Sequence, residues 1–346
     1  PRVMKYSKDI QLSSELLIID GLWGVGKTAV TELVSVFDSM ESWKIDWTFD
    51  YLPRYYQSQS IDKDAAITLI RSLFDSLTYD ICISRSVNFR YKDQTSIFRH
   101  PKKYQYLRRI LERDGDEALK KIDKNRMIIP VLTHMSTSEN DFFHMAFGER
   151  CKIINCIRHP IFILEWYVDF WSKISLSPRN FVLMVRHNDK EVPFFAFGWE
   201  DEFLAANNLE RAIKSISVLT KGYTDNLKKI KKQHGDKSIL ELSFENVVTN
   251  TDEVLSIIAD FIGRDINQKL YKKIKRRENF PRKSIYTGQG YGLFDFKSKK
   301  LKEGNEKDFI QNKMEVLKSK IRPEYYLQLV KLVEDYETKN IYFRGF

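Results

Sequence analysis

Cysteine is scarce in this sequence, and long apolar segments and internal repeats are missing. The 346 residues include only three cysteines, Cys82, Cys151 and Cys156. An odd count without paired spacing argues against a disulfide framework and against a zinc knuckle. No apolar run approaches the ~20 residues that a membrane-spanning helix needs, and residues 1–10 are polar and show no signal peptide. We therefore expect a cytoplasmic protein without a transmembrane segment.

Positive charge exceeds negative charge, with 57 Lys and Arg against 47 Asp and Glu and a net charge of +10. This excess favours anionic partners, but it does not distinguish a nucleotide from nucleic acid, a sulfated sugar or a membrane surface. Because no recognised nucleic-acid motif is present, we expect no nucleic-acid partner. Hydrophobic residues make up 42 % of the chain, which is enough for a packed core.

Short apolar runs alternate with segments of helical periodicity, and this predicts a three-layer α/β/α fold with a mostly parallel sheet. Strands are expected at 15–20, 44–49, 127–133, 152–157 and 238–242, and helices near 27–40, over most of 61–123, and from 251 onward. Two apolar runs within 181–197 predict a β-hairpin inserted at a sheet edge. We interpret 1–346 as one domain with a core at about 14–295 and a helical C-terminal segment at 304–340.

The segment after the first predicted strand has the full pattern of a phosphate-binding loop. Residues 21–28 read Gly-Leu-Trp-Gly-Val-Gly-Lys-Thr, which fits G-x-x-x-x-G-K-[ST] between a strand and a helix. Such a loop directs backbone N–H groups, here those around Gly24, Val25 and Gly26, at an anion. Lys27 would neutralise the terminal anionic group, and the Thr28 hydroxyl would bind a phosphate oxygen or a magnesium ion. The loop is also similar to that of nucleoside-monophosphate kinases.

Phosphotransferases usually hold magnesium with an Asp at the end of a buried strand. The later predicted strands end in Thr133-His134, Arg158-His159-Pro160 and Ser243-Phe244-Glu245. None of them ends in Asp, and Asp46 and Asp50, near the second predicted strand, are the possible substitutes.

The phosphate loop and these three strand ends, in this order, resemble the sulfotransferase family over residues 14–295. That family has a P-loop-type fold, binds 3′-phosphoadenosine 5′-phosphosulfate (PAPS) and releases 3′,5′-adenosine bisphosphate. The resemblance implies that Gly26, Lys27 and Thr28 hold the 5′-phosphosulfate. It also places His134 where many members carry the catalytic base. No metal is expected, because a sulfuryl group carries less charge than a phosphoryl group.

The resemblance implies a second phosphate site for the nucleotide. Arg158 falls where the family binds the 3′-phosphate, and its guanidinium fork matches a phosphate. A buried ion pair is the alternative. Arg282 and Lys283 resemble the C-terminal basic motif that grips the same phosphate, and Gly288 and Gly290 lie in the loop that would close over it.

Three positions depart from the family pattern. Gly24 stands where the family has a lysine, so Lys27 must supply the positive charge alone. The same lysine must then also stabilise the negative charge on the leaving oxygen. Trp166 stands at a cofactor-binding position that usually carries a serine, and Leu132 stands where some members have a lysine.

Two side chains are candidates for the general base. An unperturbed imidazole titrates near pH ~6.5, which suits His134 to that role; a structural histidine at the strand end is the alternative. Glu165, on the helix after Arg158, is the second candidate, although an exposed helix glutamate is commoner.

The favoured function is transfer of a sulfuryl group from PAPS to a hydroxyl of a small molecule or carbohydrate. The alternative is an ATP- and magnesium-dependent small-molecule kinase on the same scaffold, because Lys27 sits as in ATP-binding loops. Two non-catalytic interpretations are a polyanion or nucleic-acid binder, which rests on net charge alone, and a degenerate relative that binds nucleotide without transfer. The sequence identifies neither the acceptor nor the oligomeric state.

Overall fold

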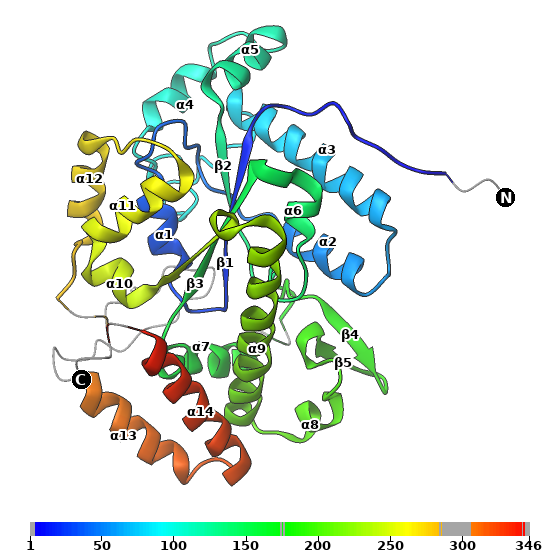
Figure 1. The fold of residues 1–346 in the computed structure, drawn as a ribbon, viewed down its shortest axis with the longest axis vertical. Coiled ribbons are helices and arrows are strands. Elements are labelled where there is room, and N and C mark those ends of the chain that lie inside the picture. Colours follow the sequence, from blue (N-terminus) through cyan, green and yellow to red (C-terminus); the bar gives the residue numbers. More distant parts are fainter. Residues whose placement is uncertain are drawn as a thin grey trace.

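A computed structural model describes residues 4–173, 175, 177–283, 285, 306–340 and 342. Its main sheet has four parallel strands in the order β2-β1-β3-β6, with α1, α11 and α12 on one side and α2, α3 and α6 on the other (Figure 1). The predicted α/β fold with a mostly parallel sheet is thereby confirmed. The strands are β1 (Glu15–Gly21), β2 (Ile128–Leu132), β3 (Cys151–Ile157), β4 (Met184–His187), β5 (Lys190–Pro193) and β6 (Ile239–Ser243). The helices are α1 (Lys27–Val34), α2 (Thr48–Gln57), α3 (Lys63–Cys82), α4 (Lys103–Arg109), α5 (Asp116–Asn125), α6 (Phe142–Phe147), α7 (Pro160–Lys173), α8 (Glu200–Ala205), α9 (Asn208–His234), α10 (Phe244–Thr249), α11 (Thr251–Ile262), α12 (Gln268–Glu278), α13 (Glu306–Lys318) and α14 (Pro323–Lys339).

The central strands are apolar runs because helices cover both faces of the sheet. In β1, Ile18 pairs with Val131 of β2 on one side and with Ile153 of β3 on the other, and all three side chains are buried. The chain leaves β1 for β2 and then returns past β1 to β3, so the strand order reverses at β1. In open α/β sheets, ligands bind beyond the carboxyl ends of the strands at such a point. The phosphate loop follows β1 at that place.

The predicted strand at 44–49 is wrong. Lys44 forms only an isolated parallel bridge with Val131, beside β2, and α2 begins at Thr48. The Asp46 carboxylate accepts a hydrogen bond from the Thr48 N–H at 2.9 Å. Such a local side-chain bond turns the backbone out of an extended conformation. The polar residue therefore ends the extended segment and starts a helix.

Several predicted elements have different bounds in the structure. Helix α1 ends at Val34, six residues before the predicted end near residue 40, and the stretch 61–123 contains α3, α4 and most of α5 with an irregular segment between α3 and α4. Strands β4 and β5 pair as an antiparallel hairpin, but they form a separate two-stranded sheet and do not extend the main one. Asn188 and Asp189 make the hairpin turn with φ of 46° and 62°, a left-handed conformation that these two residue types tolerate well.

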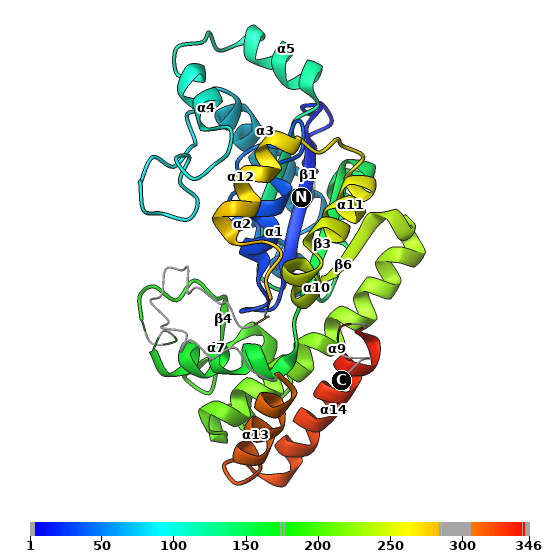
Figure 2. The same ribbon diagram turned by 90° about the vertical axis from the view of Figure 1, so that its left-hand side faces the viewer.

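Helices α7, α9, α13 and α14 pack together beyond the carboxyl edge of the sheet (Figure 2). The Glu245 carboxylate, at the start of α10, ties this group to the sheet. It accepts a hydrogen bond from the Tyr336 hydroxyl of α14 at 2.5 Å and another from the His159 N–H at 3.0 Å. Among the described helices, none combines the length and apolar character that crossing a bilayer requires.

A buried ion pair joins α4 to the segment beside β2. The Nη1 and Nη2 groups of Arg109 donate to the Glu41 carboxylate, at 2.7 and 2.9 Å, and the Tyr106 hydroxyl donates to it at 2.6 Å. Arg109 is 1 % exposed and Glu41 is 4 % exposed. Burial alone would raise the pKa of Glu41, but the hydrogen bonds and charge of Arg109 outweigh burial and lower it.

We predict that Arg109→Leu lowers the free energy of unfolding by about 3–5 kcal/mol, because the Glu41 charge would stay buried without a partner. Urea unfolding measures the change. Because the folded-state pKa of Glu41 is lowered, its contribution is present above the pKa of an unfolded glutamate and is lost as pH falls. The difference in free energy of unfolding between variant and wild type should therefore become smaller in acid.

Arg108→Leu, at a 75 % exposed side chain, is the control. It should change the free energy of unfolding by less than about 1 kcal/mol. Equal losses in both variants would contradict the prediction.

Candidate functional site

The phosphate loop is held in shape by close contact with its neighbours. Gly26, at the N-terminus of α1, has φ 86° and ψ 23°, and a Cβ there would lie 2.2 Å from the Phe244 ring. A Cβ on Gly21 would lie 2.3 Å from the carbonyl oxygen of Cys156 in β3. Only glycine fits at these two positions without displacing a neighbour. The loop leads into the N-terminus of α1, where backbone N–H groups can bind an anion.

Lys27 folds back onto the loop. Its ammonium donates to the carbonyl oxygens of Gly21 and Leu22, each at 2.7 Å, and the residue is 7 % exposed. Among the described residues, no carboxylate lies within ion-pair distance of this ammonium. Burial lowers the pKa of Lys27, while the charges of Asp20, Cys156 and Asp50 oppose that change. A buried cation with only carbonyl partners is well suited to an anionic ligand.

Arg158, directly after β3, brings a second cation to the loop. Its guanidinium donates to the Gly24 carbonyl at 3.1 Å and to the Ile285 carbonyl at 3.3 Å, and it lies over the Phe244 ring at 4.1 Å. Within the described part of the chain it forms no ion pair, and its buried Nε has no hydrogen-bond partner. The buried ion pair considered as an alternative is therefore not found among these residues. Burial lowers the pKa of Arg158, Glu245 and Tyr336 oppose this effect, and the charge of Arg282 adds to it.

Arg282 therefore lies close enough to Arg158 for their charges to repel. Its backbone N–H donates to the Val248 carbonyl at 2.6 Å, which fixes this segment beside α10. Lys283 next to it is exposed. Guanidinium groups are the side chains that bind a phosphate through paired N–H donors. Gly288 and Gly290 lie outside the described residues.

A buried carboxylate behind the loop joins three segments. Asp20 is fully buried and accepts hydrogen bonds from the N–H and hydroxyl of Thr137, at 2.8 and 2.6 Å, and from the Tyr223 hydroxyl of α9 at 2.9 Å. Burial alone would raise the pKa of Asp20, but the Thr137 hydrogen bonds and the charge of Lys27 lower it. This side chain therefore keeps its charge and fixes the 133–138 segment next to the phosphate loop.

His134 lies in that segment, two residues after the end of β2. Its Nδ1 lies 3.2 Å from the Asp50 carboxylate of α2, and its ring stacks on Trp47 with 4.9 Å between centroids and 12° between planes. Phe181 lies against the same Trp47 ring at 5.4 Å, and the Tyr51 hydroxyl donates to the Phe181 carbonyl at 2.7 Å. The imidazole is 16 % exposed. The arrangement places the half-buried His134 beside the aromatic rings of Trp47 and Phe181.

The remaining predicted site residues lie on α7, in the phosphate loop and on α1. Trp166 packs against the loop, where a Cβ on Gly24 would contact it at 3.3 Å, and its ring lies 6.0 Å from Trp23. Val25 is buried, and Thr28 is half-buried at the start of α1. Glu165 is not brought to His134: its side chain is 73 % exposed and forms an ion pair with Lys313 of α13.

Three residues of this arrangement were missed as site residues in the sequence. The sequence indicates Asp50 only as a possible magnesium ligand, and no motif points to Asp20 or Trp47. The signal for Asp20 was its place between an apolar strand and the first glycine of the loop. Trp47, the N-cap residue of α2, and Asp50 are three residues apart and so share a helix face, whereas the predicted strand at 44–49 gives them no shared face.

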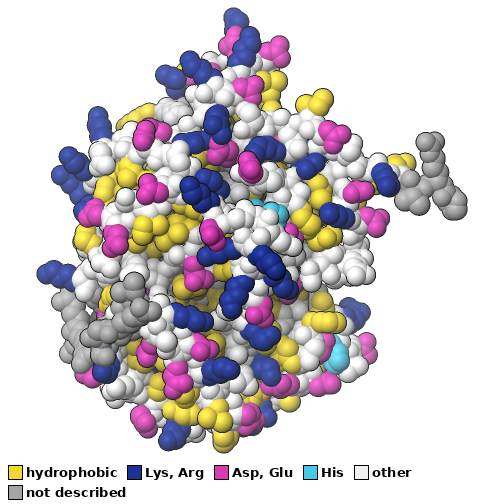
Figure 3. Space-filling model, viewed as in Figure 1, with side chains coloured by type: hydrophobic (Ala, Val, Ile, Leu, Met, Phe, Trp, Pro, Cys, Tyr) yellow, Lys and Arg dark blue, Asp and Glu magenta, His cyan; other side chains and the backbone are white. Residues whose placement is uncertain are grey.

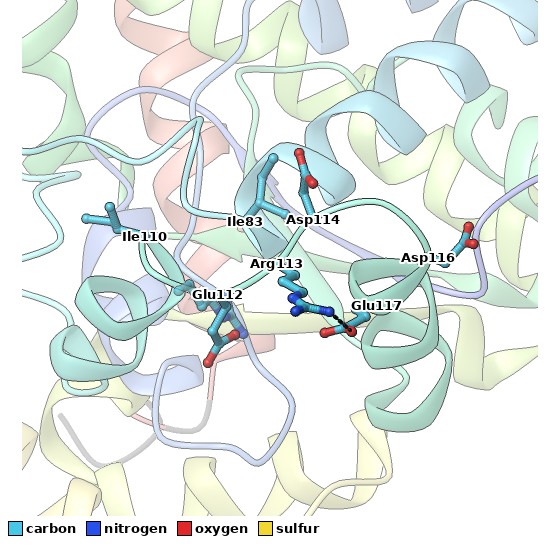
Figure 4. A pocket seen from close by; sticks show the side chains of 8 residues that line it. Ile83, Ile110, Glu112, Arg113, Asp114, Asp116 and Glu117 are labelled. Atoms are coloured by element: carbon cyan, nitrogen blue, oxygen red, sulfur yellow. Dashed lines mark ion pairs between the residues drawn. The ribbon is translucent and has the colours of Figure 1, made fainter.

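Among the described residues, no group of three or more His, Cys, Asp and Glu side chains is placed to hold a metal ion. A cavity of about 560 Å³ lies between α4 and α5, where Arg113 pairs with Glu117 beside Glu112 and Asp114 (Figure 4). Its lining shares no residue with the phosphate loop. On the face drawn in Figure 3, Lys and Arg side chains lie interspersed with Asp and Glu side chains.

No protein-family profile and no curated protein sequence matches the chain. Solved structures that resemble it include the sulfotransferase domain of the Synechococcus PCC 7002 olefin synthase, at 11 % identity and a TM-score of 0.41, covering 96 % of this chain and 98 % of that one. A Mycobacterium avium sulfotransferase has 10 % identity and a TM-score of 0.39, covering 89 % and 77 %. A mouse sulfotransferase complexed with PAP has 10 % identity and a TM-score of 0.36, covering 96 % and 88 %. These structures bear the name of the family that the motifs resemble.

We predict that Gly26→Ala destabilises the fold and disrupts the loop, because the new methyl group would overlap the Phe244 ring. The matched control is Gly263→Ala, at φ 67° and ψ 44° with nothing within 4 Å. Both variants carry the left-handed backbone cost of about 1–2 kcal/mol, and Gly26→Ala adds overpacking of about 1–3 kcal/mol. Urea unfolding compares them, and Phe244→Leu in the Gly26→Ala background should recover part of the difference. Equal losses in the two single variants would show that Phe244 does not restrict this position.

Proposed function

We propose that the chain is a sulfotransferase that transfers a sulfuryl group from PAPS to a hydroxyl acceptor. The observation that carries this proposal is the Arg158 guanidinium, which lies on the phosphate loop and has no carboxylate partner among the described residues. Arg158 would add to the phosphate loop a second cation besides Lys27. A nucleotide with phosphate at both the 3′ and the 5′ position does need two anion sites side by side.

In this proposal the loop and the two arginines bind different phosphate groups of the nucleotide. Gly24, Val25, Gly26, Lys27 and Thr28 hold the 5′-phosphosulfate through N–H groups, the ammonium and the hydroxyl. The 3′-phosphate goes to Arg158, with Arg282 and Lys283 beside it and Trp166 packed against the loop. When bound, PAPS supplies an activated sulfuryl group.

Side chains of the protein accept the proton of the acceptor hydroxyl and stabilise the negative charge on the leaving oxygen. The His134 imidazole takes the proton of the acceptor hydroxyl as a general base. Lys27 stabilises the charge that develops on the leaving oxygen. The aromatic rings of Trp47 and Phe181 beside His134 would form one wall of the site for a small-molecule or sugar-ring acceptor. Glu165 is not assigned a role, because its carboxylate is directed to α13.

The second candidate is an ATP-dependent kinase that acts on a small molecule. One observation favours it: the Lys27-Thr28 pair follows the last glycine of the loop, as in ATP-binding loops. In that case magnesium would be required, and the 3′-phosphate site would have no role. The two functions therefore predict different nucleotide preferences.

We predict that 3′,5′-adenosine bisphosphate binds the purified protein more tightly than ATP with magnesium does, as measured by calorimetric titration. Arg158→Ala should raise the Kd for the bisphosphate about 10- to 100-fold, because hydrogen bonds to charged groups contribute about 1.5–3 kcal/mol. Affinity for 5′-AMP, which lacks the 3′-phosphate, should change much less.

Arg108→Ala on α4 is the control for this titration, since it removes an exposed arginine far from the loop in the sequence and in the fold. Its bisphosphate affinity should equal that of the wild type. Preference for magnesium-ATP, with no effect of Arg158→Ala, would contradict the sulfotransferase proposal and favour the kinase.

A further inference from the structure

Both oxygens of the Asp50 carboxylate contact polar groups of His134 and Ser136. Oδ1 accepts the His134 backbone N–H at 2.6 Å and the Ser136 hydroxyl at 2.5 Å, and Oδ2 lies 3.2 Å from His134 Nδ1. Asp50 is 7 % exposed. An ionised carboxylate only accepts hydrogen bonds, so the ring nitrogen that faces it must be the donor. This geometry selects the imidazole tautomer with its proton on Nδ1.

A second contact fixes the plane of the same ring. Trp47 stacks on His134 at 4.9 Å and nearly parallel. Trp47 and Asp50 stand three residues apart at the start of α2, so one helical turn supplies both the stacking face and the hydrogen-bond acceptor. A ring held on its face and at one edge has little freedom to rotate.

We propose that Asp50 is a positioning residue, which holds His134 as the Nδ1–H tautomer and leaves the Nε2 lone pair free to take a proton. The importance of this arrangement for catalysis rests on the proposed function. The arrangement of the ring itself does not depend on that function, and it is measurable in the protein alone.

The proton step balances with these groups. His134 Nε2 accepts the proton that the acceptor hydroxyl loses as its oxygen bonds to sulfur, and the electrons of the broken sulfur–oxygen bond leave with the bisphosphate. The imidazole becomes an imidazolium, and Asp50 stays ionised and compensates its charge. With Nε2 protonated instead, the ring would have no lone pair directed at the acceptor.

The role of a magnesium ligand, which the sequence left open for Asp50, finds no support here, because both oxygens already accept protein hydrogen bonds. A purely structural role for Asp50 remains the competing explanation, since it also holds Ser136. Ser136→Ala separates the two, because it removes that hydrogen bond and keeps the contact with His134.

The first experiment records two-bond ¹H–¹⁵N spectra of the imidazoles in the wild-type protein without ligand, at a pH where they are neutral, with His134→Gln to assign the signal. The expected result is the Nδ1–H tautomer for His134. The Nε2–H tautomer, which predominates in water, would overturn the proposal without any Asp50 variant.

The second experiment compares Asp50→Asn with Ser136→Ala. The amide can place an N–H against Nδ1, so Asp50→Asn should convert His134 to the Nε2–H tautomer, and Ser136→Ala should leave the tautomer unchanged. With PAPS and 2-naphthol as probes, Asp50→Asn should lower kcat about 10²- to 10⁴-fold, the range of general base catalysis, with a KM for PAPS close to that of the wild type.

An unchanged tautomer in Asp50→Asn would overturn the proposal, and so would equal losses of kcat in Asp50→Asn and Ser136→Ala. Failure of the proposed function gives a different result. The wild type would then neither bind the bisphosphate nor transfer sulfuryl, while the His134 tautomer would still depend on Asp50.

Discussion

The buried carboxylate of Asp20 is the interaction on which the candidate site depends. It lies in β1, one residue before the loop glycine Gly21, and accepts hydrogen bonds from Thr137 and from Tyr223 of α9. An isolated ionised carboxylate in a protein interior is very unfavourable, so these donors must stay in place for the charge to be tolerated. The same residue therefore connects the phosphate loop, the segment that carries His134 and the long helix behind both. The ammonium of Lys27 adds to this balance by lowering the pKa of Asp20 further.

The cations at the loop are arranged differently from the buried ion pair elsewhere in the fold. Glu41 and Arg109 satisfy each other through two hydrogen bonds. Lys27 and Arg158 instead donate to backbone carbonyls, and in the described part of the chain neither has a carboxylate within ion-pair distance. A desolvated positive charge without a negative partner destabilises the folded protein. It becomes favourable when an anion arrives, which is why this arrangement is better explained by binding than by folding.

The sequence predicted the parts of the site that depend on neighbouring residues. The phosphate loop and the strand ends at His134 and Arg158 follow directly from apolar runs and glycine spacing, and in a parallel sheet such ends meet at one edge. Partners that come from elsewhere in the chain were not predictable in this way. The direction of Glu165 depends on which side of α7 faces α13, and the contact of Asp50 with His134 depends on α2 replacing an expected strand.

The sequence by itself determined the α/β fold, the glycine-rich loop after β1 and the two strand-end side chains next to it. These features are local, because hydrogen-bonding pattern, glycine conformation and apolar periodicity are fixed by residues close together in the chain. Only the tertiary structure decided that Arg158 lacks a carboxylate among the described residues, that Phe244 restricts Gly26 and that Asp50 faces His134. Those contacts join segments far apart in the chain, and the packing of helices on the sheet sets them.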